Sequence, residues 1–421
     1  MAESVDTIVI GAGQAGLATS WHLSERGVEH LILERADTVG SSWRDRRWDS
    51  FCLVTPNWMI DLPGFAYDGG EPDGFMPKDE VVAYLQRYAS AIDAPIRFGT
   101  EVRRLAREGD GFQVTTGSGR IRARNVVVAA GSYGRSKRPP FAAALPDDIT
   151  RMDPSEYRSP DALPPGPVLV VGSGQSGTQI AEELYQSGRE VFMATGTAGR
   201  VPRRHAGRDV LRWLEMAAEA GAGPFADTAD TLDPEELREE RHAAKHHVSG
   251  RDGGHDLNLH RFARDGVHLF GHLEGVQDGT LRFARDLHEN LRYADQVAVE
   301  IRSNLNGLIE KAGIDVTPED PEVELELQDG FDQPQREALD LRDAGIRTVI
   351  WATGFWMDFD RWIDLPVFDG DGYPRQHRGV TDHPGLYFVG LYWMYSFASD
   401  LLYGVGEDAG HVADHLADRN A

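Results

Sequence analysis

The sequence is poor in the residues that build disulfide frameworks and membrane spans. Its 421 residues include one cysteine, Cys52, so neither an internal disulfide nor a redox-active cysteine pair can form within the chain. No run approaches about 18 uninterrupted apolar residues, which predicts no membrane-spanning helix. The N-terminus enters a strand pattern at once, without the basic and apolar segments of a signal peptide. We therefore expect a cytoplasmic protein.

Basic residues are also scarce. The 43 lysines and arginines face 68 acidic residues, which gives a formal charge of −25. Such a field repels nucleic acid and anionic lipid, so neither nucleic acid nor a membrane is expected as a partner. The histidines, among them His255 and His260, lack the repeated two-ligand spacing of a metal centre, and no cysteine joins them. No metal site is predicted.

The stretch "DTIVIGAGQAGLATSWHL", which begins at Asp6, has the pattern of a dinucleotide-binding unit. A β-branched run, a glycine turn, a helical pattern and a second apolar run follow in order. Gly11 permits the tight turn, Gly13 lets the backbone approach a pyrophosphate, and Gly16 allows close packing of helix and strand. Glu34 ends the second run, 23 residues after Gly11, where a carboxylate can accept hydrogen bonds from a ribose. The unit predicts a dinucleotide site.

The same device recurs in "GPVLVVGSGQSGTQIAEEL", which begins at Gly166. Thr195 stands where the first unit has its acid, and Arg200, Arg203 and Arg204 follow closely. Loss of the acid removes repulsion, and guanidiniums can hold a ribose 2′-phosphate, so this site favours NADPH over NADH. The predicted turn consists of Gly172, Ser173, Gly174, Gln175, Ser176 and Gly177.

Two such units in one chain predict an α/β protein with two Rossmann-like dinucleotide-binding domains of the glutathione-reductase type, the second inserted in the first. Residues 1–160 and 356–421 are expected to bind FAD. Residues 166–355 are expected to bind NADPH and to carry a helical insertion at about 210–330. Gly131, after the apolar run "NVVVAA", is placed to let the chain pass close to the FAD.

A flavin reduced by NADPH can pass its electrons to a disulfide, a diffusible acceptor or molecular oxygen. The single cysteine closes the disulfide route. From the residues alone, an oxygenase, an NADPH:acceptor oxidoreductase and a redox-sensing flavoprotein stay open.

The serial order of motifs resembles the group B flavin-dependent monooxygenases, and within them a bacterial branch often labelled as flavoproteins of potassium transport. Flavin-containing monooxygenases, indole-pyruvate oxygenases and Baeyer–Villiger enzymes are its relatives. The resemblance covers nearly the whole chain and includes "GSSWRDRRWDSFCLVTP", "MPKDEVVAYLQRYA", "VVVAAGSYGRSKRP", "PRRHAGRDV", "ATGFWMDFD" and "GVTDHPGLYFVGLYW". It implies insertion of one oxygen atom from O2 through a C4a-(hydro)peroxyflavin, with FAD and NADPH as cofactors.

The resemblance also assigns roles to single residues. Trp43 is expected near the isoalloxazine, the backbone of Val102 at the adenine, and Gly390 close to the flavin. Asn57 lies where the family places polar groups beside the flavin edge, although an Asx-turn explains it equally well. Arg200 resembles the arginine that stabilises the peroxyflavin in Baeyer–Villiger enzymes.

The substrate is less well defined. Tyr392 and Trp393, in "GLYWMYSFASDLLYG", form either a substrate wall or core packing; a wall predicts an aromatic or apolar small molecule. Between the two domains the family signature has a histidine, and here Asp153 takes its place when Tyr157 is aligned as the closing aromatic. This departure argues against a Baeyer–Villiger reaction and leaves N- or C-hydroxylation and decarboxylating oxygenation open. We expect N- or C-hydroxylation, with Baeyer–Villiger or decarboxylating oxygenation as the alternative. The sequence leaves open whether the chain acts alone or as a homodimer.

Overall fold

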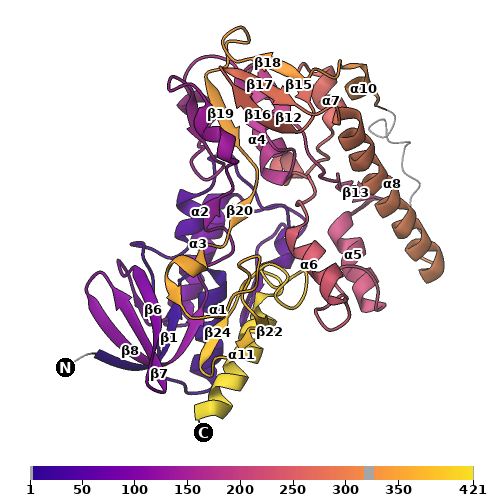
Figure 1. The fold of residues 1–421 in the computed structure, drawn as a ribbon. Coiled ribbons are helices and arrows are strands. Elements are labelled where there is room, and N and C mark those ends of the chain that lie inside the picture. Colours follow the sequence, from indigo (N-terminus) through magenta and orange to yellow (C-terminus); the bar gives the residue numbers. More distant parts are fainter. Residues whose placement is uncertain (1–2, 317–326, 421) are drawn as a thin grey trace.

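The computed structural model describes residues 3–316 and 327–420. It contains two large sheets, each built around a strand that leads into a glycine turn (Figure 1). Of the predicted cofactor domains and insertion, residues 1–2, 317–326 and 421 lie outside the described residues.

The first sheet has the order β21-β6-β7-β8-β1-β2-β5, with β24 and the β22–β23 pair attached beside β8. At its centre β1 runs parallel to both β2 and β8. Alternate residues of β1 face opposite sides, since Ile8 and Ile10 join one apolar cluster and Val9 joins another. A strand that is buried on both faces explains the continuous apolar run "TIVI". The strands of this sheet are β1 (Glu3–Ile10), β2 (His30–Leu33), β5 (Ile96–Arg97), β6 (Val102–Glu108), β7 (Gly111–Thr116), β8 (Gly119–Val128), β21 (Ile363–Asp364), β22 (Gln376–His377), β23 (Val380–Thr381) and β24 (Leu386–Phe388).

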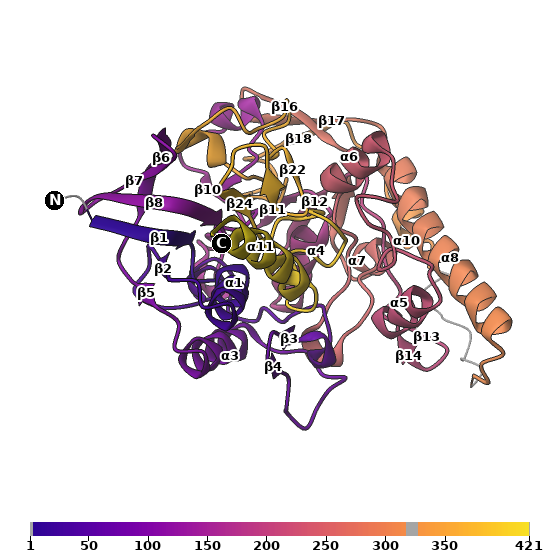
Figure 2. The same cartoon turned by 90° about the horizontal axis from the view of Figure 1, so that it is seen from below.

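The last part of the chain returns to the first sheet. Strand β24 pairs in parallel with the second half of β8, and the first half of β8 pairs with β7. Helix α11 (Val405–Asn420) then packs along α1 (Gln14–Glu25), as Figures 1 and 2 show. Residues more than 380 positions apart therefore meet in one layer, where Gln14 Nε2 donates to the Asp400 carbonyl and His22 Nε2 lies 2.9 Å from the Gly406 carbonyl.

The second sheet is entirely parallel, with the order β10-β19-β11-β12-β15. Its strand β11 alternates as β1 does: Val168 and Val170 face one cluster, and Leu169 and Val171 face another. Its elements are β10 (Thr150–Met152), β11 (Val168–Val171), α4 (Gln175–Gln186), β12 (Val191–Ala194), β15 (His268–Phe270) and β19 (Thr348–Trp351). An antiparallel sheet of β16 (Leu273–Gln277), β17 (Thr280–Phe283) and β18 (Ala338–Asp340) lies at one end of this body.

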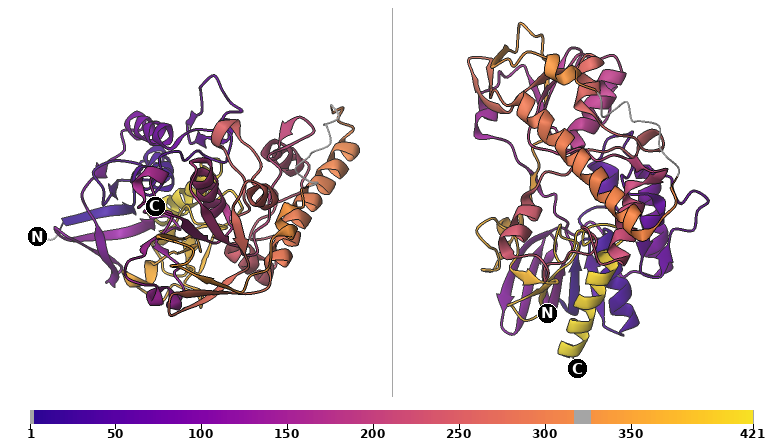
Figure 3. Two further views of the ribbon diagram at one scale, coloured as in Figure 1. Left: turned by 90° about the horizontal axis from the view of Figure 1, so that it is seen from above. Right: turned by 90° about the vertical axis from the view of Figure 1, so that its right-hand side faces the viewer.

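The region of the predicted insertion contains both helices and strands. Its helices are α5 (Val210–Glu219), α6 (Pro234–His242), α7 (Leu259–Arg264), α8 (Leu287–Ala312) and the beginning of α10 (Asp329–Asp332), and its strands include β15, β16 and β17. Helix α8, with 26 residues the longest of the described helices, runs along the outside of the molecule (Figure 3). None of the described helices is long and apolar enough to cross a membrane.

The remaining described elements complete the connections. The helices are α2 (Ser41–Asp45), α3 (Lys78–Ala91), and the 3-10 turns η1 (Asn57–Met59), η2 (Pro140–Ala144), η3 (Pro160–Ala162), η4 (Arg251–Gly253) and η5 (Phe359–Arg361). The strands are β3 (Asp61–Leu62), β4 (Phe65–Ala66), β9 (Arg135–Ser136), β13 (Arg204–His205), β14 (Arg208–Asp209) and β20 (Phe355–Trp356). The β9–β20 pair joins the two bodies near the crossing points of the chain.

Candidate functional site

The first glycine turn is fixed by backbone contact. Gly11 has φ +107°, and a Cβ there would lie 2.6 Å from the Ala129 carbonyl oxygen; a Cβ on Gly16 would lie 1.9 Å from the Gly11 oxygen. Side chains are therefore excluded at both positions. Gly13, at the N-terminus of α1, has no heavy atom within 4 Å of its Cβ position. That open face next to free helix N–H groups is where a pyrophosphate fits.

The second turn repeats this geometry. Gly172 also has φ +107°, with the Ala352 carbonyl oxygen 2.5 Å from its Cβ position, and a Cβ on Gly177 would lie 2.0 Å from the Gly172 oxygen. Gly174, at the N-terminus of α4, is open except for the Lys245 carbonyl oxygen at 3.6 Å. The residues present thus form two cradles of the same shape.

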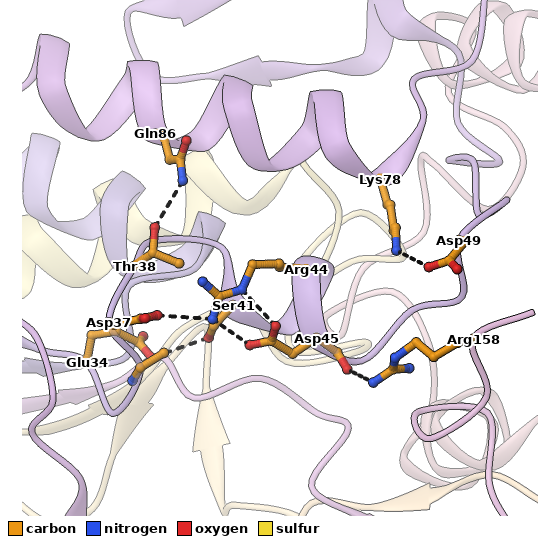
Figure 4. A network of polar contacts seen from close by, with 11 residues as sticks. Glu34, Asp37, Thr38, Ser41, Arg44, Asp45, Asp49, Lys78, Gln86 and Arg158 are labelled. Atoms are coloured by element: carbon orange, nitrogen blue, oxygen red, sulfur yellow. Dashed lines mark hydrogen bonds and ion pairs between the residues drawn. The ribbon is translucent and has the colours of Figure 1, made fainter. Parts of the chain in front are cut away.

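Glu34 lies at the first turn, as its position at the end of β2 predicts. Its buried carboxylate accepts hydrogen bonds from the backbone N–H of Ala12 (2.8 Å) and of Ala36 (2.9 Å). The Ser41 hydroxyl is 3.4 Å away, and Arg44 on the same short helix pairs separately with Asp37 and Asp45 (Figure 4). A carboxylate held in this way keeps acceptor positions for a ribose hydroxyl.

Several predicted flavin contacts gather around the same turn. The Trp43 indole N–H donates to Gln14 Oε1 at 3.2 Å. Gly390 has φ +77°, and a Cβ there would lie 2.5 Å from Ala15 Cβ. Gly131 has φ +78° and an open Cβ position. Their roles toward a flavin remain predictions.

Arg47 was not singled out from the sequence. Its guanidinium lies over the rings of Trp43 (5.3 Å), Phe51 (5.5 Å) and Tyr133 (5.6 Å), and burial lowers its pKa. The double arginine in "RDRRW" was the available signal.

Val102 and Asn57 belong to two separate elements, β6 and η1. Val102 begins β6, two residues after Thr100, whose N–H donates to the Glu34 carbonyl at 2.8 Å. The buried Asn57 amide donates to the Glu71 carbonyl at 2.9 Å, which ties a loop together, and its Oδ1 has no hydrogen-bond partner among the described residues. No Asx-turn contact is formed at that oxygen, and the catalytic role of Asn57 stays a prediction.

The loop predicted to bind the 2′-phosphate is attached to α8. Thr195 is buried; its hydroxyl donates to the Phe270 carbonyl (2.8 Å) and accepts from Asn290 (3.1 Å). Arg200, 3% exposed, forms an ion pair with Asp295 at 2.9 Å. Both contacts use side chains of α8, so this helix holds the loop in place.

Arg203 and Arg204 also have protein partners. The buried Arg203 donates to the Val54 carbonyl at 2.7 Å and pairs with Asp209 at 2.5 Å. Arg204 is exposed and donates to the Gly254 carbonyl at 2.8 Å. The structure brings these arginines to the loop, and their role toward a phosphate remains a prediction.

A buried histidine under the second turn was missed by sequence reasoning. His247 donates from Nδ1 to the Ser173 carbonyl at 3.0 Å, and burial lowers its pKa to about 4, helped by nearby Arg200. Nε2 of His247 and Nη1 of Arg200 are buried without hydrogen-bond partners among the described residues. The pair "HH" in "AAKHHVSG" was the available signal, and it carries no periodicity that would mark one histidine as buried.

His260 takes part in a neighbouring contact. Its Nδ1 accepts from the Gly330 N–H, so Nε2 carries the proton toward Asp295 at 3.0 Å. No group of three or more potential metal ligands occurs in the part of the chain that the structure describes.

The aromatic segment after Gly390 meets a lysine from the second body. Lys245 Nζ lies 3.2 Å from the Tyr392 ring centroid, and the Tyr392 N–H donates to Ser132 Oγ at 3.2 Å. Trp393 is buried at 1% exposure with φ +49°, and its carbonyl accepts from Arg241. Tyr392 is half-buried. The substrate-wall role predicted for both stays a prediction.

The fold and these cradles define a flavoprotein oxidoreductase with two dinucleotide sites. The family model of the pyridine nucleotide-disulphide oxidoreductases matches residues 8–219. An uncharacterized CzcO-like oxidoreductase of Geobacillus kaustophilus is 32% identical over 99% of both chains. The indole-3-pyruvate monooxygenase YUCCA1 of Oryza sativa is 33% identical over 50% of this chain and 54% of its own.

Solved structures agree in fold. A flavin-containing monooxygenase from Stenotrophomonas maltophilia aligns over the whole of both chains with a TM-score of 0.65 and 20% identity. The OTEMO complex with FAD and NADP aligns over 100% of this chain and 85% of that chain, with a TM-score of 0.57 and 17% identity.

The chain therefore belongs to the pyridine nucleotide-disulphide oxidoreductase family. The predicted two-domain dinucleotide fold and the resemblance stated from the motifs are confirmed. Among these neighbours, the OTEMO structure holds both FAD and NADP.

The open glycines give a direct test of the cradles. Gly13→Ala places its methyl group in open space, so the protein should fold but retain about tenfold less FAD than the wild type, because the methyl group takes space that the pyrophosphate needs. Gly174→Ala should keep its FAD and raise KM for NADPH by about tenfold. Flavin absorbance of the purified protein and steady-state kinetics measure the two effects.

Gly16→Ala is the steric control, since its Cβ would overlap the Gly11 oxygen. It should yield no folded protein. Normal FAD content in Gly13→Ala would contradict the assignment of the first turn.

His247 gives a pH test. Because its pKa falls from about 6.5 in the unfolded chain to about 4 in the folded one, the unfolded state binds the proton first as the pH drops. Stability should therefore fall between pH 6.5 and pH 4, by about 2 kcal/mol at pH 5. In urea unfolding, the free energy of unfolding of His247→Gln should fall between pH 7 and pH 5 by about 2 kcal/mol less than that of the wild type. An unchanged pH dependence would show that His247 does not titrate in this way.

Proposed function

We propose that the protein is an NADPH-dependent FAD monooxygenase that inserts one oxygen atom from O2 into a small organic substrate, with N- or C-hydroxylation as the reaction. Residues 1–160 and 356–421 form the FAD-binding domain in this proposal, and residues 166–355 form the NADPH-binding domain. The carrying observation is the pair of equal glycine cradles in a chain with a single thiol. The low cysteine content supports a cytoplasmic location.

The thiol argues against disulfide reduction. Cys52 is half-buried, its Sγ lies 3.8 Å from the Ser50 carbonyl, and burial raises its pKa. A thiol with a raised pKa is a poor nucleophile, and no second cysteine exists to complete a redox pair. Electrons from a flavin in this chain would go to a diffusible acceptor or to oxygen.

The side chains and turns have defined tasks in this proposal. The N-termini of α1 and α4 would hold the two pyrophosphates, and Glu34 would hold the ribose of FAD. When bound, NADPH supplies a hydride and FAD supplies the site of oxygen activation. The protein orients the two cofactors and excludes water around them.

A Baeyer–Villiger reaction has less support from the residues. Asp153 stands at the aligned histidine position, and its carboxylate pairs with Arg138 (3.2 Å) and accepts from the Ser155 N–H (2.9 Å). It caps a turn, and a carboxylate cannot replace the donor and acceptor of an imidazole. Decarboxylating oxygenation of a 2-oxo acid is the alternative favoured by the indole-3-pyruvate monooxygenase relative.

The oxygen test uses the FAD-loaded protein, NADPH and ¹⁸O2 with four probes: indole-3-pyruvate, indole, N,N-dimethylaniline and cyclohexanone. We expect one ¹⁸O atom in a product, with less hydrogen peroxide per NADPH than in the absence of the probe. NADP⁺ should slow the return of oxidised-flavin absorbance when the reduced protein meets oxygen, because a dry site delays loss of the activated oxygen. Stoichiometric peroxide with every probe, together with rapid anaerobic reduction of menadione, would instead establish an acceptor oxidoreductase.

The choice of NADPH over NADH is tested at Arg204. This side chain is exposed, so Arg204→Ala should fold normally, raise KM for NADPH by about tenfold and leave KM for NADH within about twofold. Arg208→Ala is the matched control from the same loop, because its guanidinium stacks on Trp213 at 4.9 Å. Equal changes in KM for NADPH and for NADH would show that Arg204 does not bind the 2′-phosphate.

A further inference from the structure

Gln14 and Gln175 occupy the same position in the two glycine turns, "GAGQAG" and "GSGQSG". Gln14 Nε2 donates to the Asp400 carbonyl at 3.2 Å. The backbone N–H of Gln175 donates to the Lys245 carbonyl at 3.3 Å. Each turn thus touches one residue of a charged pair, Asp400 and Lys245.

The two charged groups influence one another without direct contact. Burial lowers the pKa of Lys245 and raises that of Asp400, and in each case the charge of the partner opposes the shift. Asp400 Oδ1 is buried without a hydrogen-bond partner among the described residues, and the Lys245 ammonium forms no ion pair with any of them. The charge of Glu240 also acts on Lys245. The ammonium is held instead against the Tyr392 ring at 3.2 Å and near the Phe397 ring at 5.5 Å.

The backbone carbonyl of Lys245 therefore lies at the second glycine turn, while its side-chain ammonium lies near the glycines predicted to approach the flavin. Its carbonyl faces the N-terminus of α4, beside the open side of Gly174. Its ammonium lies over the ring of Tyr392, which follows Gly390 by two residues. The backbone N–H of Tyr392 donates to Ser132, the neighbour of Gly131. Glycines 131 and 390 are those predicted to approach the flavin.

We propose that Lys245 is a positioning residue that couples occupancy of the second dinucleotide site to the charge around the flavin. A pyrophosphate at α4 competes with the Lys245 carbonyl for the Gln175 N–H, because both are acceptors for the same helix-terminal donor. Release of that carbonyl shifts the backbone at Lys245 and moves its ammonium relative to Tyr392 and Asp400. The inference rests on the proposed FAD and NADPH sites.

The experiment uses the FAD-loaded protein and NADP⁺ as the probe. Calorimetry gives Kd, and the flavin difference spectrum gives the response of the flavin side. In the wild type, NADP⁺ should perturb the flavin spectrum with the same midpoint as the calorimetric Kd. Lys245→Met should bind NADP⁺ within about threefold of the wild type but lose at least about four-fifths of the spectral amplitude, since coupling and affinity are separate free energies. Lys245→Arg should retain most of the amplitude.

Lys137→Met is the matched control. Lys137 also lies on an aromatic ring, Trp356 at 4.3 Å, and burial likewise lowers its pKa. It should keep the full spectral amplitude.

Three results would overturn the inference. The first is a full spectral amplitude in Lys245→Met, and the second is a wild type whose flavin spectrum does not respond to NADP⁺. The third is a loss of NADP⁺ affinity beyond about tenfold in Lys245→Met, which would identify Lys245 as a direct phosphate ligand. If Lys245→Met fails to retain FAD, Asp400→Asn provides the second variant; it should reduce the amplitude at unchanged Kd, and an unchanged amplitude overturns the inference. A wild type that binds neither FAD nor NADP⁺ would refute the proposed function instead.

Discussion

The structure depends on backbone-to-backbone contact at two glycine turns. Where Gly16 and Gly177 approach the carbonyls of Gly11 and Gly172, there is no room for one carbon atom more. This contact sets the angle at which each helix leaves its strand, and so points the helix N-terminus at the open Gly13 or Gly174. The closing segments "AAG" and "ATG" supply the other wall, through the carbonyls of Ala129 and Ala352. Everything that could hold a dinucleotide follows from that angle.

The second turn has a support that the first one lacks. Helix α8 contributes Asn290 to Thr195 and Asp295 to both Arg200 and His260. A buried ion pair adds little net stability when both partners are present, but removal of one partner is costly. The arrangement therefore fixes the geometry of the loop after β12 more than it stabilises the domain. It also explains why a long polar helix, far from the glycine turn in sequence, packs against the loop after β12.

The sequence was sufficient for the parts of the site that depend on local geometry. Glycine spacing, the acid at position 34 and the apolar runs are local patterns, and the structure places each at a turn or strand end as expected. The sequence could not show where Arg200 and Arg204 would point, since their partners Asp295 and Gly254 come from distant segments. His247 and Lys245 lie outside any motif, and their burial is a tertiary property. The strands inside the predicted helical insertion were missed because short runs such as "VHLF" do not separate strand from buried helix.

The two turns are alike in shape and different in what faces them. At the first, the equivalent glutamine uses its side chain to reach both Trp43 and the Asp400 carbonyl, so the turn is tied into its own body. At the second turn, the backbone N–H of Gln175 donates to the carbonyl of Lys245. The ammonium of the same lysine interacts with the charge of Asp400, which lies in the other body. A resident cofactor needs a turn that is fixed from its own side, whereas a ligand that enters and leaves can act on whatever it displaces. The asymmetry in these contacts therefore agrees with the proposed roles of the two turns, FAD at the first and NADPH at the second.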